Sequence, residues 1–543
     1  MKIRKSIRAS LVLPFTGLLS GHSVSLMAGD AQTPNPADFQ TSDRCVACHN
    51  GMVNSDGDEY SIGLDWRASL MANSSRDPYW QASLRRETMD HAPAGAAIED
   101  ECSACHMAIP HYQSKQSGRL TPVFAHLPLD SHPSKEHADG VTCTVCHQIT
   151  PERLGTAESY NGNFVIGGPA ADGSHAEFGP YEIAAGLQQI MRSSTQGYQP
   201  QHGAQIQSAE LCASCHTLIT EARDASGAIV GSLPEQMIYQ EWQHSDFHNE
   251  RTCQACHMPA VDNAVPVTRI LGVARPNARR HQFIGANFVM QSILGRYHDE
   301  LAVAAEPAEL YDAADRTRRY LQAEAASLRV SPLKLHDRRL LTDVTVENLG
   351  GHKLPTAFPA RRTWLHFIVR DRDHRVIFES GALNCDGSIA GNDNDTDPAR
   401  FESHYREIRA PDQVQIYEAI LGDHEGRVTT GLLFATDYLK DNRLLPRGFD
   451  KANASANIAV HGDALADPGF TDRGHAIRYS VDIGNAVGPF EAEVELWYEP
   501  IGYRWAKNLS TYDSDETRWF VGYYDSMGRG SAVLLTHATS SSQ

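Results

Sequence analysis

The sequence predicts two successive fold types: a mainly α region with little regular core of its own, followed by an all-β, sandwich-like region. Five copies of the pattern Cys-x-x-Cys-His lie in the first half, separated by short segments rich in Gly, Pro and polar residues. Residues 300–327 then carry apolar side chains at helical intervals, and beyond residue 330 the apolar pattern changes to alternation. We therefore expect a domain at 29–330 and a β-sandwich domain at 331–543.

The N-terminus has the features of a secretory signal peptide. Lys2, Arg4, Lys5 and Arg8 form a positive segment, and an apolar stretch over 9–19 and a zone of small residues over 25–31 follow. A membrane anchor is the alternative, but the apolar run contains Pro14 and is shorter than the roughly 20 residues that span a bilayer. We expect 1–28 to be a cleaved signal peptide, with export to the periplasm or the cell surface and no stable membrane span.

Ten of the eleven cysteines belong to the repeated pattern, which is the attachment signature of c-type haem. Two thiols three positions apart match the two vinyl groups of one porphyrin, and the adjacent His binds the iron. The predicted attachment residues are Cys45, Cys48, Cys102, Cys105, Cys143, Cys146, Cys212, Cys215, Cys253 and Cys256, and the predicted proximal ligands are His49, His106, His147, His216 and His257.

Zinc and redox dithiols are the alternatives for Cys-x-x-Cys pairs. Neither explains why His follows the second Cys in every copy. The sequence therefore predicts five covalent haem c groups in 29–330. Because the segments between motifs are too short to bury separate cores, the porphyrins must lie close together and supply much of the apolar interior.

The second axial ligand decides whether a haem only relays electrons or also does chemistry. More His residues precede residue 285 than five distal positions require, so complete bis-His ligation is feasible. The five preferred distal ligands are His91, His137, His202, His244 and His281, with His248 and His352 as alternatives. For each of them a surface or core His held by hydrogen bonds is the competing interpretation.

After residue 330, several segments have strand composition and partial alternation. They are 340–346, 364–369, 376–378, 414–417, 429–434, 477–483 and 490–498. Seven or more strands between Gly, Pro and Asp turns favour a β-sandwich. The acidic loop at 392–397 offers oxygens that suit calcium, although a solvated turn is the alternative. Cys385, beside this loop, is expected to be buried and inert.

The chain has 67 acidic and 48 basic side chains and a formal charge of −19. This balance argues against binding to nucleic acid and against attraction to anionic membrane surfaces. An acidic protein that exchanges electrons is expected to associate with redox partner proteins through a basic patch on the partner, with salt-sensitive binding.

Several strings around the motifs resemble a known family. They are 69–80 (SLMANSSRDPYW), 100–107 (DECSACHM), 139–143 (DGVTC), the Glu241-Trp242-Gln-His244-Ser245 run and Gly351-His352-Lys-Leu-Pro355. In these strings the chain resembles bacterial multihaem cytochromes c of the broad cytochrome c-554 type, and its five motifs would make it a pentahaem member. That group is related to hydroxylamine oxidoreductase and octahaem tetrathionate reductase. The resemblance covers roughly 40–300 and implies closely stacked, mostly bis-His haems in a periplasmic electron-transfer protein, with Gly-His-Lys-Leu-Pro marking an appended β-domain.

The sequence thus predicts an electron-relaying multihaem cytochrome, with no catalytic residue assigned. The alternative is an oxidoreductase that acts on a small nitrogen or sulfur compound at one haem with an open distal position. Every motif ends in His and only five are present, whereas octahaem enzymes carry more, so the relay is favoured over the enzyme. A third interpretation is a subunit of a larger electron conduit, docked through the β-domain.

Overall fold

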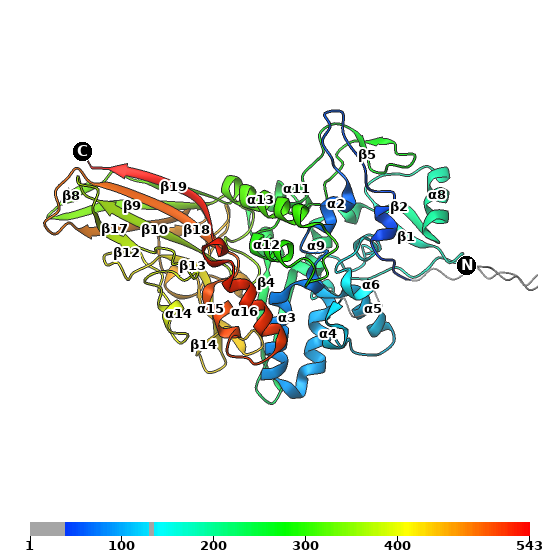
Figure 1. The fold of residues 1–543 in the computed structure, drawn as a ribbon, viewed down its shortest axis with the longest axis horizontal. Coiled ribbons are helices and arrows are strands. Elements are labelled where there is room, and N and C mark those ends of the chain that lie inside the picture. Colours follow the sequence, from blue (N-terminus) through cyan, green and yellow to red (C-terminus); the bar gives the residue numbers. More distant parts are fainter. Residues whose placement is uncertain (1–37, 130–134, 543) are drawn as a thin grey trace, which may run out of the picture. The chain divides into compact units, whose positions relative to one another are not determined.

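The computed structural model describes residues 38–129 and 135–542 (Figure 1). The predicted signal peptide at 1–28 lies outside the described residues, so it stays a prediction. Within the part that the structure describes, no helix is long and apolar enough to cross a membrane.

The helices that precede residue 325 are mostly short, and each Cys-x-x-Cys-His motif lies on one or extends just past its end. They are α1 (Asp43–Val46), α2 (Ile62–Arg67), α3 (Pro78–Asp90), α4 (Gly95–His106), α5 (Ala108–Gln116), α6 (Lys135–Ala138), α7 (Cys143–Cys146), α8 (Ala185–Thr195), α9 (Ala209–His216), α10 (Ile238–Gln243), α11 (Cys253–His257), α12 (Phe288–Arg296) and α13 (Pro307–Glu324).

The same region also contains three two-stranded sheets. They pair β1 (His175–Gly179) with β2 (Tyr198–His202) in parallel, and β3 (Thr217–Arg223) with β4 (Ile229–Met237) and β5 (Val265–Pro266) with β6 (Ala274–Arg275) antiparallel. The chain is 32% helical and 25% strand, so the predicted mainly α fold class is wrong. The β-branched residues of Thr217-Leu-Ile-Thr220 favour an extended chain as soon as α9 ends.

The helix predicted over 300–327 is α13, and it begins at Pro307 rather than at residue 300. Pro is favoured at the first helical position, and Glu306 and Glu309 form a capping box there. Leu310, Ala314 and Leu321 share the buried face of the helix. This face packs on α12 and on the strands that follow.

Two larger sheets make up the C-terminal region, shown from green to red in Figure 1. The seven-stranded sheet has the order β14-β13-β10-β18-β19, with β11 on β10 and β15 on β13, and the six-stranded sheet has the order β12-β17-β9-β7, with β16 on β17 and β8 on β9. Phe367 of β10 stacks on Tyr479 of β17, with ring centres 3.8 Å apart, so the two sheets share one apolar core.

The predicted segments 340–346, 364–369, 376–378, 477–483 and 490–498 coincide with strands, and 414–417 overlaps the start of one. The predicted strand at 429–434 is wrong, because most of it is turn and loop, and β7, β8, β12, β16 and β19 were not predicted. The bounds of the strands are β7 (Ala326–Val330), β8 (Lys334–His336), β9 (Arg339–Asn348), β10 (Arg362–Arg370), β11 (Val376–Ser380), β12 (Glu407–Ile408), β13 (Ile416–Asp423), β14 (Val428–Thr429), β15 (Ala435–Asp441), β16 (Phe470–Thr471), β17 (Gly474–Asp482), β18 (Glu491–Glu499) and β19 (Val533–Ser541).

The C-terminal region is not all-β, which is the second correction to the predicted fold class. It includes α14 (Asp393–Thr396), α15 (Tyr503–Leu509) and α16 (Asp515–Asp525). Arg85 of α3 donates to both carboxylate oxygens of Glu516 in α16, at 3.0 and 2.8 Å. Residues of both predicted domains belong to one compact unit, so the boundary at residue 330 stays a prediction.

Candidate functional site

The ten motif cysteines are all half-buried and none forms a disulfide. Thiols from different motifs lie beside one another. The thiol of Cys45 lies close enough to that of Cys143 to shift its pKa, and the same holds for Cys105 with Cys215 and for Cys212 with Cys253. The first motif is therefore next to the third, and the fourth is next to both the second and the fifth. Groups attached at these cysteines would be adjacent, as the short spacing of the motifs predicts.

Four of the five motif histidines share one hydrogen-bond arrangement, in which Nδ1–H donates to a backbone carbonyl. The acceptors are Val267 for His49 at 2.6 Å, Ser74 for His106 at 2.9 Å, Phe178 for His147 at 2.6 Å and Ile284 for His257 at 2.5 Å. A proton fixed on Nδ1 leaves the lone pair on Nε2, and ligating imidazoles are typically held in this way.

Burial keeps these rings neutral. It lowers the pKa of His106 to about 4, and burial together with His257 and Arg361 lowers the pKa of His216 to about 4. A metal binds the neutral imidazole, so these groups need lose no proton at neutral pH to become ligands. The residues present therefore fit covalent haem at the motifs.

Four histidines outside the motifs have the same arrangement. The Nδ1–H groups of His91, His248, His281 and His352 donate to the carbonyls of Asp224, Ser245, Arg279 and Lys353, at 2.8, 2.5, 3.2 and 3.0 Å. The His91 side chain is fully buried and its Nε2 has no hydrogen-bond partner. An unpaired buried nitrogen is costly unless a ligand takes its lone pair.

Two pairs of imidazoles stand at a spacing that suits one metal ion between them. The ring centres of His147 and His281 are 6.3 Å apart with planes at 19°, and those of His257 and His352 are 6.2 Å apart at 12°. Two imidazoles that bind one metal from opposite sides, with bonds of about 2 Å, have ring centres roughly 6 Å apart. Within the described residues, no second imidazole stands in this way opposite His49, His106 or His216.

The other three preferred distal ligands, His202, His137 and His244, make different contacts. The His202 ring is exposed and lies 3.7 Å from Glu182. His137 stacks on His126 with ring centres 3.6 Å apart. His244 uses Nε2 to donate to the carbonyl of Asp450 at 3.0 Å, so the nitrogen that usually binds iron is engaged. Of the five preferred distal ligands, the geometry favours His91 and His281.

Sequence reasoning ranked His248 and His352 below His244, and it did not select His175. The last is 2% exposed, and its Nδ1 has no hydrogen-bond partner. His248 and His352 are distinguished by the backbone carbonyl that accepts their Nδ1–H. That carbonyl is local for His248 and His352, but the conformation that presents it is not readable from the residue types.

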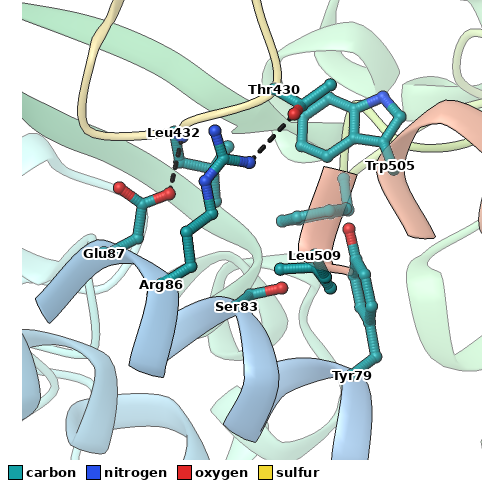
Figure 2. A pocket seen from close by; sticks show the side chains of 9 residues that line it. Tyr79, Ser83, Arg86, Glu87, Thr430, Leu432, Trp505 and Leu509 are labelled. Atoms are coloured by element: carbon teal, nitrogen blue, oxygen red, sulfur yellow. Dashed lines mark hydrogen bonds between the residues drawn. The ribbon is translucent and has the colours of Figure 1, made fainter. Parts of the chain in front are cut away.

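A small cavity lies where α3 meets the C-terminal region (Figure 2). On the α3 side it is lined by Tyr79, Ser83, Arg86 and Glu87, and on the other side by Thr430, Leu432, Trp505 and Leu509. Figure 2 shows Arg86 donating to the Thr430 hydroxyl, at 2.9 Å, and Glu87 accepting from the Leu432 N–H, also at 2.9 Å. The cavity measures about 10 Å³, which is room for one water molecule. It is therefore a packing feature of this contact and not a substrate site.

The acidic loop at 392–397 offers no support for calcium. Asp395 lies 2.7 Å from Arg362 in a buried ion pair, and Asp393 pairs with Arg400. Carboxylates that already neutralise arginines have few oxygens left for a cation. The neighbouring Cys385 is exposed, so the expectation that it is buried was wrong.

In the C-terminal region, called the two-sheet region below (residues 326–541), His404, Asp467 and His475 form a buried cluster that has the composition of a metal site. The amide groups of Asn442 and Gln415 donate to Nδ1 of His404, at 3.2 and 3.4 Å. Both amides are fixed by their oxygens, which accept backbone N–H groups of Glu418 and Tyr405. His404 must therefore carry its proton on Nε2, which donates to Asp467 at 2.9 Å. A hydrogen-bonded core explains the cluster.

Comparison with known proteins gives one informative result. No family model and no curated protein matches this chain. Among solved structures, the chain is similar to a penta-heme cytochrome c552 from Thermochromatium tepidum, at a TM-score of 0.52 and 15% sequence identity, covering 93% of this chain and 100% of the other. At that identity the likeness establishes the fold, and the five motifs are the independent link to haem.

Proposed function

We propose that this chain is an exported multihaem c-type cytochrome that relays electrons through five covalently attached haems. The observation that carries the proposal is the shared state of the imidazoles inside and outside the motifs, in which Nδ1–H donates to a carbonyl and Nε2 makes no hydrogen bond to the described residues. The likeness to a penta-heme cytochrome supports it. The finer relation to cytochrome c-554 and hydroxylamine oxidoreductase is part of the proposal.

The residues have separate roles in this proposal. The ten motif cysteines form the thioethers, and the five motif histidines bind iron on the proximal side. His281 would complete the coordination shared with His147, and His352 that shared with His257. His91 and His248 would supply two further distal nitrogens. When bound, haem supplies a one-electron couple whose potential depends on axial ligands, hydrogen bonds and burial.

The adjacency of the motifs gives the relay an order. The first motif is next to the third, and the fourth touches the second and the fifth. The third and fourth are also near one another, since burial raises the pKa of Cys146 and the charge of the nearby Cys215 thiolate raises it further. An electron that enters at the first motif would thus pass the third and fourth before it leaves by the second or fifth.

A second function is favoured by the number of facing imidazoles. Within the described residues none stands opposite His49, His106 or His216, and His91 and His248 would supply a second imidazole for only two of these three. An iron left without a second imidazole would be able to bind a small nitrogen or sulfur compound, which would make the chain an oxidoreductase.

We also propose that the redox partner protein carries a basic patch. This part of the proposal rests only on the formal charge of −19 of this chain.

Low-temperature EPR of the oxidised, haem-loaded chain separates the two functions. Five low-spin ferric signals, unchanged by nitrite, sulfite or cyanide, are expected for the relay. One high-spin signal that shifts with any of these anions would replace the relay with the enzyme. A haem content below five per chain would contradict both.

A further inference from the structure

The segment 350–356, which carries His352, lies against α10 and the residues that follow it, although about a hundred residues separate them in sequence. A Cβ atom at Gly351 would be 3.1 Å from the Cβ of Phe247 and 3.4 Å from the Trp242 ring, so only glycine allows this approach without displacement. The hydroxyl of Ser245 donates to the carbonyl of Gly351 at 3.0 Å. The segment is thus held by these contacts against the part of the chain that carries the motifs, called the haem-motif region below (residues 38–324).

Glu241 of α10 makes the strongest of these contacts. Its side chain is fully buried, and Oε2 accepts two hydrogen bonds from the segment. One comes from the backbone N–H of Lys353 at 3.1 Å and the other from the hydroxyl of Thr356 at 2.6 Å. A single carboxylate oxygen therefore fixes the backbone directly after His352.

The charge on Glu241 is balanced inside the protein. Arg443 lies 3.1 Å from Oε1 of Glu241 and 2.7 Å from Asp441, while the Lys353 ammonium donates to Asp441 at 2.7 Å. These four side chains comprise two anions and two cations, and all are buried. Burial raises the pKa of Asp441, but Arg443 and Lys353 outweigh it and hold that pKa well below its ordinary value. A buried carboxylate can stay ionised in such a network.

The hydrogen bonds lead from Glu241 to the imidazole through one residue. The N–H of Lys353 donates to Glu241, and the carbonyl of Lys353 accepts the Nδ1–H of His352 at 3.0 Å. Fixing both ends of this residue sets the orientation of the His352 ring. The ring then stands 6.2 Å from that of His257, nearly parallel to it.

We propose that Glu241 is a positioning residue that holds His352 in place as the axial ligand opposite His257. The ligand would come from the two-sheet region and its anchor from the haem-motif region, so the fifth haem would be complete only when the two regions are docked. This inference rests on the proposed function, because it requires a haem at Cys253 and Cys256.

The test uses the full chain loaded with haem, and Glu241→Ala is the main variant. One haem in five is expected to become high-spin in ferric EPR, and added imidazole should return it to low spin. Glu241→Gln should stay low-spin, because its amide oxygen still accepts both hydrogen bonds. Glu499→Ala is the matched control. It removes another buried carboxylate, paired with Arg362 at 2.8 Å, and should lower the melting temperature with no high-spin signal.

His352→Ala distinguishes failure of this inference from failure of the proposed ligation. A low-spin spectrum in His352→Ala would show that His352 is not a ligand. A high-spin haem in His352→Ala with a wild-type spectrum in Glu241→Ala would overturn the role of Glu241 alone, and so would a high-spin signal in Glu499→Ala. Should Glu241→Ala fail to fold, Thr356→Val removes one of the two bonds to Oε2. A high-spin fraction equal to wild type in that variant would also overturn the inference.

Discussion

Several histidines of the haem-motif region differ in their hydrogen bonds from those within the two sheets. In the first group, His49, His91 and His281 donate Nδ1–H to a backbone carbonyl, and Nε2 makes no hydrogen bond to the described residues. In the second, His366 contacts Glu495 and Glu379 through its two nitrogens, at 2.8 and 3.0 Å, and His404 likewise uses both. The two groups therefore differ in the partner of the second nitrogen and not in burial.

The apolar cores differ in the same sense. Most of the two-sheet region belongs to one large cluster, with Phe367, Tyr479 and Leu496 fully buried in it, and two smaller clusters lie beside it. Much of the haem-motif region is divided among small clusters such as those around Ile109, Ile98 and Met52. We therefore expect the haem-motif region to depend more on bound haem for its apolar interior than the two-sheet region does.

The comparison predicts that removing a haem has the largest effect. Cys212→Ala with Cys215→Ala removes the attachment at the fourth motif, which touches the second and fifth. We expect the haem-motif region to lose its cooperative melting transition, measured by calorimetry together with haem content per chain. Cys385→Ser, which changes the exposed cysteine, is the control and should leave both unchanged. A four-haem protein with the wild-type melting temperature would contradict the comparison.

A buried change in the two-sheet region should cost stability without touching the haems. Asp467→Asn removes the charge that accepts from His404 and lies 3.3 Å from His475. Hydrogen bonds to charged groups contribute about 1.5–3 kcal/mol each, so we expect a loss of about 3 kcal/mol in the free energy of unfolding, measured by denaturant titration. The visible spectrum of the folded protein should be unchanged. An altered spectrum would show that the regions are not separable in this way.

Single distal ligands should change spectra more than stability. His91→Ala and His281→Ala are each expected to convert one haem to high spin, because Nε2 of His91 is buried without a hydrogen bond and the ring of His281 stands 6.3 Å from that of His147. His202→Ala, at an exposed ring, should leave the ferric EPR spectrum as in wild type. A spectrum of His202→Ala with one new high-spin haem would restore the original sequence-based choice.

The smallest effect concerns pH. Burial, aided by the nearby Glu221, raises the pKa of Glu101, which precedes Cys102, to about 7. Reduction adds negative charge nearby and raises that pKa further, so the reduced protein holds the proton more tightly. The potential of one haem should therefore fall as pH rises through about 7, by at most about 59 mV per pH unit. Redox titration of Glu101→Gln should show a flatter dependence, and an equal slope in both proteins would exclude Glu101.

The sequence by itself determined the attachment chemistry, because thioether formation needs two thiols and a ligand at fixed local spacing. It also determined α13 and the main strands of the C-terminal region, since periodicity within one element reports which face is buried. It did not determine the two-stranded sheets of the haem-motif region. Their strands lie among or just after the haem motifs, whose spacing dominated the prediction.

Only the tertiary structure distinguished among the surplus histidines. His91 is held by a carbonyl 133 positions away and His49 by one 218 positions away, and the anchor of the His352 segment is 112 positions from Lys353. Such contacts depend on how the whole chain packs, and no local pattern encodes them. A histidine becomes a candidate ligand when the fold occupies one of its nitrogens and leaves the other facing a cofactor.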